Sequence, residues 1–264
     1  MRLVVVGCAG SFPSAESAAS CYLVQADDAT GRTWNVVLDL GSGAIGPLQR
    51  LLDPADVDVV ALSHLHPDHM SDVCGLYVYL RYRPDRAVGE APMPLYGPFG
   101  TASRVADAYG LEPGEDMSGE LAVHTWQADR SVRVGPMRLT PVPVNHPVPA
   151  YGIRVEGPSE ADPSATVTLA YTGDTDACVG LDELATGADL LLAEAAFVEG
   201  REDAVRNIHL TGRRAGEAAA RGGSAALMLT HIPAWNPPQV AAVEAAGVFT
   251  GPITTAAPGM VVEL

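Results

Sequence analysis

The hexapeptide His64-Leu65-His66-Pro67-Asp68-His69 places three imidazoles and one carboxylate directly after the apolar run Val57–Leu62. In extended backbone, residues two positions apart point to the same side, so His64 and His66 can reach one metal ion. Pro67 fixes the backbone and turns it toward a helix, which redirects Asp68 and His69 toward a second ion. Unrelated surface or capping roles do not explain four such residues within six positions. The hexapeptide therefore predicts a metal site for Zn²⁺, with Mn²⁺ or Fe as alternatives on the same ligands.

Three further candidate ligands lie at the ends of other apolar, strand-like runs. His146, Asp174 and His231 each follow such a run directly, where a side chain is held on a rigid edge. The Asp174 carboxylate is suited to bridge two ions, and an N-cap for a helix starting near Asp176 is the alternative interpretation. His124 lies inside a strand-like run instead, and we interpret it as structural.

Composition limits the class of substrate. The chain has 264 residues, of which 47% are hydrophobic and 18% charged, so it is expected to be globular. Its formal net charge of −16 argues against broad nucleic-acid binding, which depends on Lys and Arg neutralising phosphates. Arg81, Arg83 and Arg86 form an Arg cluster that we interpret as a solvated helix end. A polyanionic substrate is therefore expected to be small, or held mainly by metal ions.

The cysteines and the N-terminal stretch indicate where the protein works. Cys8, Cys21, Cys74 and Cys178 show no CxxC spacing, so we expect buried thiols in a reducing compartment rather than disulfides. The first ten residues, MRLVVVGCAG, predict a strand and a turn and lack the apolar core of a signal peptide. No apolar run is long enough to cross a bilayer. We expect a cytoplasmic protein with no membrane partner.

Strand-like and helix-like runs follow an order that predicts an α/β protein. Apolar spacing predicts a helix over Met70–Arg81, and the Pro/Gly-rich stretch Arg83–Gly100 is predicted to be a connector. The C-terminal third alternates helix and strand over Asp176–Thr186, Asp189–Ala193, Thr211–Arg221, Ala225–Thr230 and Pro238–Ala246. Strand-rich runs followed by such alternation predict sheets with helices on their outer faces. We expect one domain over residues 1–264.

The hexapeptide, together with Leu38-Asp39-Leu40-Gly41-Ser42-Gly43 and Val6-Gly7-Cys8-Ala9-Gly10-Ser11, resembles the metallo-β-lactamase superfamily over nearly the whole chain. The resemblance implies an α/β (α+β) fold, an αββα sandwich of two mixed sheets flanked by helices, with the site at one edge. It also implies the ligands of two ions. His64, His66 and His146 would hold one, Asp68, His69 and His231 the other, and Asp174 would bridge them.

Two later motifs resemble the ribonuclease Z branch of that superfamily. Glu194 lies in Glu194-Ala195-Ala196-Phe197, and His209 lies in His209-Leu210-Thr211. The resemblance implies that Glu194 orients His209, which protonates the leaving oxygen or stabilises the developing phosphate charge. A charge at a strand end and a solvated residue before a helix are the alternative interpretations. Because lactam and thioester hydrolases of the fold are not expected to show this pair, their chemistry is disfavoured.

The expected reaction is phosphodiester hydrolysis. Two ions about 3.5–4 Å apart lower the pKa of a bridging water and supply hydroxide at neutral pH, with Asp68 as the candidate general base. Ribonuclease Z enzymes that process tRNA usually carry a protruding arm, and Arg83–Pro94 is too short and too poor in Lys to form one. The chain also resembles cyclic nucleotide phosphodiesterases of the superfamily that lack the arm. We therefore rank 3′,5′-cyclic nucleotides such as cyclic AMP first and tRNA 3′-end cleavage second.

Other possibilities remain open at the level of sequence. The chain could be another hydrolase of this fold, or a metal-binding member without turnover, although Asp68, Glu194 and His209 argue for catalysis. Gly7-Cys8-Ala9-Gly10 lacks the third glycine and the helix of a dinucleotide-binding turn. The family resemblance implies a homodimer. Four aromatic residues are candidates for stacking a base, although a helical aromatic stripe is more often core: Tyr77, Tyr79, Tyr82 and Trp235.

Overall fold

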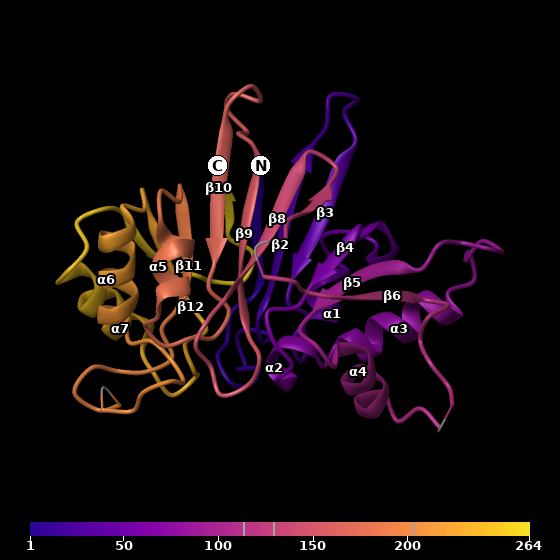
Figure 1. Ribbon diagram of the computed structural model, residues 1–264, viewed down its shortest axis with the longest axis horizontal. Coiled ribbons are helices and arrows are strands. Elements are labelled where there is room, and N and C mark those ends of the chain that lie inside the picture. Colours follow the sequence, from indigo (N-terminus) through magenta and orange to yellow (C-terminus); the bar gives the residue numbers. More distant parts are fainter. Residues whose placement is uncertain (113, 129, 203) are drawn as a thin grey trace.

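Two seven-stranded β-sheets lie face to face in the computed structural model, which describes residues 1–112, 114–128, 130–202 and 204–264 (Figure 1). The first sheet has the order β14 (Val261–Glu263), β1 (Arg2–Gly7), β2 (Cys21–Asp27), β3 (Thr33–Leu38), β4 (Val59–Ala61), β5 (Met93–Gly97) and β6 (Leu121–Thr125). The second has the order β13 (Ile253–Thr255), β12 (Leu227–Thr230), β11 (Leu190–Glu194), β10 (Thr166–Tyr171), β9 (Tyr151–Pro158), β8 (Met137–Pro143) and β7 (Val132–Val134). Each sheet therefore consists of strands that follow one another in the chain, except that the last strand, β14, joins the first sheet beside β1.

Each sheet is antiparallel at one end and parallel at the other. Strands β14, β1, β2 and β3 are antiparallel neighbours, whereas β3, β4, β5 and β6 are parallel. In the second sheet β7 to β10 are antiparallel and β10 to β13 are parallel. The carboxyl ends of parallel strands meet at one edge of a sheet, where ligands bind in open α/β sheets. The turns after β4, β10 and β12 are the ones that carry candidate ligands.

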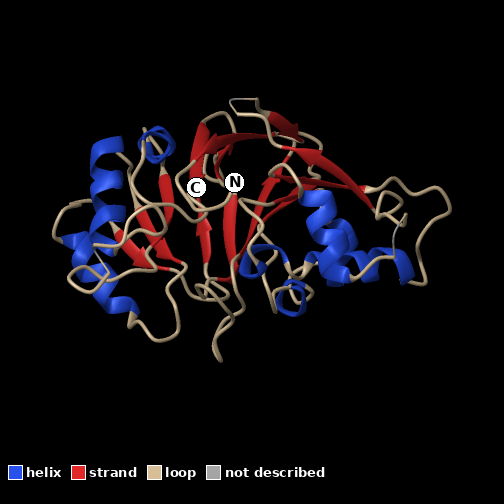
Figure 2. Cartoon of the chain, turned by 60° about the horizontal axis from the view of Figure 1, so that its bottom comes forward, coloured by secondary structure: helices blue, strands red, loops and turns tan. Residues whose placement is uncertain are grey.

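Helices cover the outer face of each sheet (Figures 1 and 2). The first sheet is flanked by α1 (Ile45–Leu48), α2 (Pro67–Met70), α3 (Val73–Tyr82) and α4 (Thr101–Tyr109), with a short 3₁₀ turn at Pro54–Asp56. The second is flanked by α5 (Val179–Ala185), α6 (Gly212–Gly222) and α7 (Pro238–Ala246). The layers are therefore helix, sheet, sheet and helix, which confirms the predicted fold class.

Three apolar clusters hold these layers together. Between the two sheets, Tyr22 and Leu38 of the first pack in one cluster with Ile153 of the second. Val37, which points to the other side of β3, belongs to the cluster under the first helices, and a third cluster includes Leu191 under α5 to α7. Because a central strand is buried on both faces, it reads as a continuous apolar run rather than an alternating one.

Several elements differ from those predicted by the sequence. The predicted connector Arg83–Gly100 is wrong, because it contains β5, which pairs in parallel with β4 and β6. Its prolines and glycines masked a five-residue strand. The predicted helix Met70–Arg81 is two helices, since α2 ends at Met70 and α3 begins at Val73. The three-residue strands β13 and β14 carried too short a pattern to predict.

The structure of the described residues bears on two further predictions, which concern membrane-spanning helices and the cysteines. None of the helices among the described residues is long and apolar enough to cross a membrane. The four cysteines are free thiols, and Cys8 and Cys21 are buried as predicted, whereas the prediction is wrong for Cys74 and Cys178, which are only partly buried.

Candidate metal centre

Seven predicted ligands from both sheets converge at one edge of the sandwich. His64 and His66 follow β4, and α2 carries the next two ligands one turn later. His146, Asp174 and His231 follow β8, β10 and β12. The structure arranges them in two groups, one of His64, His66 and His146 and one of Asp68, His69, Asp174 and His231.

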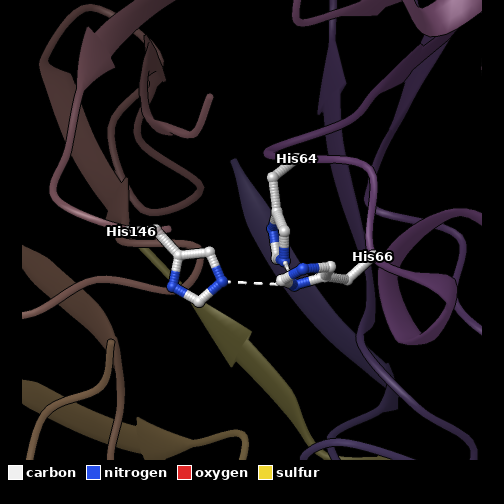
Figure 3. A group of neighbouring side chains, drawn as sticks. All are labelled: His64, His66 and His146. Atoms are coloured by element: carbon white, nitrogen blue, oxygen red, sulfur yellow. Dashed lines mark hydrogen bonds between the residues drawn. The ribbon is translucent and has the colours of Figure 1, made fainter. Parts of the chain in front are cut away.

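The first group consists of three imidazoles from the two halves of the molecule (Figure 3). His64 Nε2 lies 3.1 Å from His66 Nδ1, and His146 Nε2 lies 3.2 Å from the same His66 atom. His64 Nδ1 is hydrogen-bonded to Ser63 Oγ at 3.1 Å. His146 Nδ1 lies 2.9 Å from the Ile208 carbonyl oxygen. The second ring nitrogens of His64 and His146 are thus occupied by neighbours, while their Nε2 atoms both face Nδ1 of His66, as in bound metal sites.

The second group is entirely buried. His69 Nε2 lies 3.2 Å from His231 Nε2, and His231 Nε2 lies 3.1 Å from Asp68 Oδ2. Asp174 reaches both groups, because its Oδ1 is 3.2 Å from His69 Nε2 and its Oδ2 is 3.7 Å from His64 Nε2. The N-cap of α5 is Cys178, so the helix-cap interpretation of Asp174 is wrong.

Two atoms of this group test whether the donor set fits metal ions. Asp174 Oδ1 and His231 Nδ1 are buried and, within the part of the chain that the structure describes, have no hydrogen-bond partner. Leaving such atoms unsatisfied is costly, and a divalent ion would satisfy them. Imidazole and carboxylate donors are the ligands expected for Zn²⁺ and similar ions. The residues present therefore fit bound divalent metal.

Electrostatics keep most of these groups in their ligand form. Burial, aided by the neighbouring His69, holds the pKa of His64 well below its usual value, so its imidazole is neutral. Burial alone would raise the pKa of Asp174, but the neighbouring His231 and His69 outweigh burial and hold that pKa well below its usual value. The Asp174 carboxylate is therefore ionised. For His69, the carboxylates of Asp174 and Asp39 outweigh burial and raise the pKa. A metal ion would displace that proton, since ligands bind in the deprotonated form.

Asp39 is a supporting residue that the sequence reasoning did not single out. Its Oδ2 lies 2.7 Å from His69 Nδ1 and accepts a hydrogen bond from Tyr171 Oη at 2.6 Å. The Ser63 backbone amide donates to Asp39 Oδ1 at 2.6 Å, and the Ser63 hydroxyl donates to Oδ2 at 2.7 Å. A carboxylate on the far nitrogen of a ligating histidine fixes its tautomer and orientation. The available signal was its place after β3 in the Leu38–Gly43 motif.

The buried Glu194 and the partly buried His209 form a pair beside both groups. His209 Nδ1 lies 2.9 Å from Glu194 Oε1, while the backbone amides of Thr175 and Ala196 donate to the same carboxylate at 2.9 and 3.1 Å. Burial lowers the pKa of His209, but the Glu194 carboxylate outweighs it and raises that pKa to about 9. The ring centroid of His209 is 5.5 Å from those of His146 and of His231, so it adjoins ligands of both groups.

Asp176 also organises the site and was missed as a functional candidate. Its Oδ2 accepts the Asn207 amide at 2.8 Å and Arg206 Nε at 2.7 Å. Its own backbone amide donates to the Asn145 carbonyl at 2.8 Å. Asp176 thereby ties the loop before His209 to the segments that carry His146 and Asp174. Nothing in the local sequence distinguishes it from an ordinary residue before a helix.

The backbone is strained at this site. Across residues 1–112, 114–128, 130–202 and 204–264, the non-glycine residues with positive φ are Ser11, Asp39, Asn207 and His231, at φ of 66°, 56°, 65° and 54°. Each is a candidate ligand, contacts one, or lies in the His209 loop. Such strain persists only where surrounding contacts impose it, and it is concentrated at functional sites.

Comparisons with known proteins place this geometry in a family. A family model described as the beta-lactamase superfamily domain matches residues 34–232. The chain belongs to the beta-lactamase superfamily. Another superfamily protein, ML1173 of Mycobacterium leprae, is 42% identical over 255 residues that cover 96% of this chain and 85% of ML1173.

Two further relatives of this superfamily member narrow the branch. The probable metallo-hydrolase YhfI of Bacillus subtilis is 30% identical over the whole of both chains, and its crystal structure matches with a TM-score of 0.84, 27% identity, and coverage of 100% of this chain and 99% of YhfI. Ribonuclease Z of Mycolicibacterium gilvum is 30% identical over 90% of this chain and 87% of its own. The predicted ribonuclease Z-like branch is confirmed. The family match, the metallo-hydrolase relative and the group of His and Asp side chains together support metal binding by a hydrolase of this superfamily.

Proposed function

We propose that this protein is a metal-dependent phosphodiesterase with two divalent ions, Zn²⁺ first, on the seven ligands His64, His66, Asp68, His69, His146, Asp174 and His231. The observation that carries the proposal is the hydrogen-bonded pair of Glu194 and His209 beside those ligands. When bound, two such ions supply hydroxide from water at neutral pH and neutralise phosphate oxygens. Lactam and thioester hydrolases of this fold are not expected to carry such a Glu–His pair.

The roles of the protein residues follow from their contacts. Glu194 accepts the Nδ1 proton of His209, which leaves Nε2 of the protonated ring to donate to the departing oxygen. Its raised pKa keeps that ring protonated at neutral pH. Although burial raises the pKa of Asp68, hydrogen bonds with His231 and His69 hold it well below its usual value. Asp68 is therefore ionised and able to orient the attacking water as a general base.

The surface charge supports a small substrate. Arg81 and Arg86 both pair with the Glu120 carboxylate, at 3.4 and 2.6 Å, and Arg83 pairs with Asp85 at 3.3 Å. This Arg cluster is therefore largely neutralised and offers little to a nucleic-acid backbone. With a net charge of −16, the protein is better suited to one phosphodiester group held by metal ions than to a polyanion. We rank 3′,5′-cyclic nucleotides such as cyclic AMP first.

A second candidate is endonucleolytic cleavage at the 3′ end of tRNA. It is favoured by the 30% identity with the ribonuclease Z of Mycolicibacterium gilvum over most of both chains. The local sequence disfavours it, because the segment between α3 and α4 contains the short strand β5 rather than a basic arm.

One assay separates these candidates. We expect a single metal-loaded preparation to hydrolyse bis(p-nitrophenyl) phosphate and cyclic AMP and to leave precursor tRNA intact. Cleavage of the precursor tRNA alone would reverse the ranking, and inactivity on all three substrates would contradict phosphodiester hydrolysis. A chelator-treated sample is the control for metal dependence.

The assembly and location are part of the same proposal. The family resemblance favours a homodimer, and the free thiols favour the reducing cytoplasm. Sedimentation of the purified protein at several concentrations tests the dimer.

A further inference from the structure

Two exposed aromatic side chains contact each other on loops that meet at the candidate ligand His231. Phe12 and Trp235 lie 223 positions apart in the sequence, yet their ring centroids are 5.3 Å apart at an interplanar angle of 34°. Phe12 is 41% exposed and Trp235 is 61% exposed. Other large apolar side chains, such as Phe99 and Tyr82, are also exposed, but Phe12 and Trp235 are distinguished because their exposed rings contact each other.

The loops that carry the two rings contact each other at the same candidate ligand, His231. The Ser11 amide, one residue before Phe12, donates to His231 Nε2 at 3.3 Å. The Gly10 amide donates to the Ile232 carbonyl at 3.2 Å, and a Cβ on Gly10 would lie 2.2 Å from the His231 carbonyl oxygen. Consecutive Cα atoms are about 3.8 Å apart, so the backbone of Phe12 lies one residue away from the Ser11 amide that contacts His231.

The turn that carries Trp235 is rigid although its ring is exposed. The Asn236 amide donates to the Pro233 carbonyl at 2.8 Å. The buried Asn236 side chain donates to the Ala196 carbonyl at 2.8 Å and accepts a hydrogen bond from Arg201 at 2.5 Å. On the opposite loop, the positive φ of Ser11 directs the chain that leads to Phe12. A fixed aromatic surface at the edge of a metal site is suited to stacking a planar ring.

The other aromatic candidates do not share this position. Tyr77 is buried in the cluster under α3, and Tyr79 donates to Asp53 at 2.6 Å. Tyr82 is 65% exposed but lies at the last residue of α3. Of these candidates, Trp235 is the one fixed next to a predicted metal ligand.

We propose that the Phe12–Trp235 pair binds the nucleobase of a nucleotide substrate whose phosphodiester group lies at the metal centre. This inference rests on the proposed function, because it assigns the base of that same substrate. The rings are too close together for a base to insert between them, so the base stacks on the outer face of the pair. Stacking also compensates for the net charge of −16, which offers a nucleotide little electrostatic attraction.

Two phosphodiesters with the same leaving group test the proposal. One is thymidine 5′-(p-nitrophenyl phosphate), and the other is methyl p-nitrophenyl phosphate, which has no base. We expect Trp235→Ala to raise KM for the thymidine ester about tenfold or more, and Phe12→Ala to raise it less. KM for the methyl ester, kcat and metal content should stay unchanged. Tyr82→Ala, an exposed aromatic change at the far end of α3, is the matched control and should change neither KM.

Conservative variants separate stacking from a structural role. Trp235→Phe keeps a flat ring and should stay close to the wild-type KM, whereas Trp235→Leu keeps apolar packing and should behave like Trp235→Ala. An unchanged thymidine-ester KM in Trp235→Ala, or an equal rise for both esters, would overturn the proposal while leaving phosphodiester hydrolysis intact.

A binding measurement tests the pair without turnover. Adenosine 5′-monophosphate should quench the tryptophan fluorescence of the wild-type protein, ribose 5-phosphate should not, and Trp235→Phe should lose the effect. If the metal-loaded enzyme hydrolyses neither ester, the proposed function fails, and this titration alone decides the stacking site. Absence of quenching in the wild-type protein would then overturn it.

Discussion

The side chain of His209 is held by one carboxylate between the two groups of predicted ligands. Glu194 accepts its Nδ1 proton and is itself fixed by two backbone amides, so the imidazole has one orientation. Asp39 does the same for His69 from the opposite side. The residues at this site therefore have two different roles. Some can bind a metal ion, and others orient a neighbouring side chain.

At this scale we predict that His209→Ala keeps its metal and loses turnover. Removing a positioned general acid should lower kcat by about 10²–10⁴-fold, because the leaving oxygen must then take its proton from water. Metal analysis and steady-state kinetics on a diester check this. His124→Ala is the matched control, because it alters an exposed histidine of β6 that stacks on Tyr96. This variant should retain full activity. Full activity in His209→Ala would remove that residue from the mechanism.

The pH profile gives a second measure of the same residue. The acid form of His209 is present below its pKa of about 9 and is lost as the pH rises through that value. Glu194→Gln removes the charge that raises this pKa, so the alkaline fall of kcat should move to lower pH. An unchanged alkaline limb would contradict the pairing as the source of the acid.

At the scale of elements, the ligands depend on loops that follow strands of both sheets and on contacts between those loops. Gly41 shows how close the contacts are, because a Cβ there would lie 1.9 Å from the Asp68 carbonyl oxygen. Residues 204–208, directly before His209, form no helix or strand, and Asp176 ties them to the other segments.

We predict that Asp176→Asn lowers kcat by about 10- to 100-fold, because a displaced loop misaligns His209. Metal content and KM should change little, since the seven ligands and the Phe12–Trp235 pair are untouched. Asp182→Asn, which alters the exposed carboxylate paired with Arg221 at 2.7 Å, is the control and should behave like the wild type. Loss of metal in Asp176→Asn would instead assign it to the metal site itself.

At the scale of the whole molecule, the site joins the two sheets. His64 and His66 follow a strand of the first sheet, while His146, Asp174 and His231 follow strands of the second. Ions bound between them would link two layers otherwise held by the apolar cluster around Tyr22 and Ile153. Metal binding is thereby coupled to the stability of the sandwich.

The corresponding prediction concerns thermal unfolding. An ion at about 100 times its Kd stabilises the folded state by about 2.7 kcal/mol, which corresponds to a rise in Tm of about 5–10 °C for a chain of this size. Calorimetry should show that chelation lowers Tm and that added Zn²⁺ restores it. In Asp174→Ala, which lacks the carboxylate that reaches both groups, the Zn²⁺-dependent rise should be smaller. A Tm independent of metal would contradict a site that links the sheets.

The predicted elements succeeded where a local pattern was long and failed where it was short. The strands before His64, Asp174 and His231 carry apolar runs that are buried on both faces and are visible in sequence. Strand β5, bounded by glycine and proline, was predicted as a connector, because its place between β4 and β6 is set by pairing rather than by its own residues.

The sequence by itself determined which side chains are available for chemistry, because metal-type residues at strand ends and the Glu194 and His209 motifs are local features. Only the tertiary structure decided how they combine. It brings His146 beside His66, places Asp39 behind His69, and joins Phe12 to Trp235, in each case across tens or hundreds of residues. Such contacts arise from the packing of two sheets on one core, and no short stretch of sequence encodes that packing.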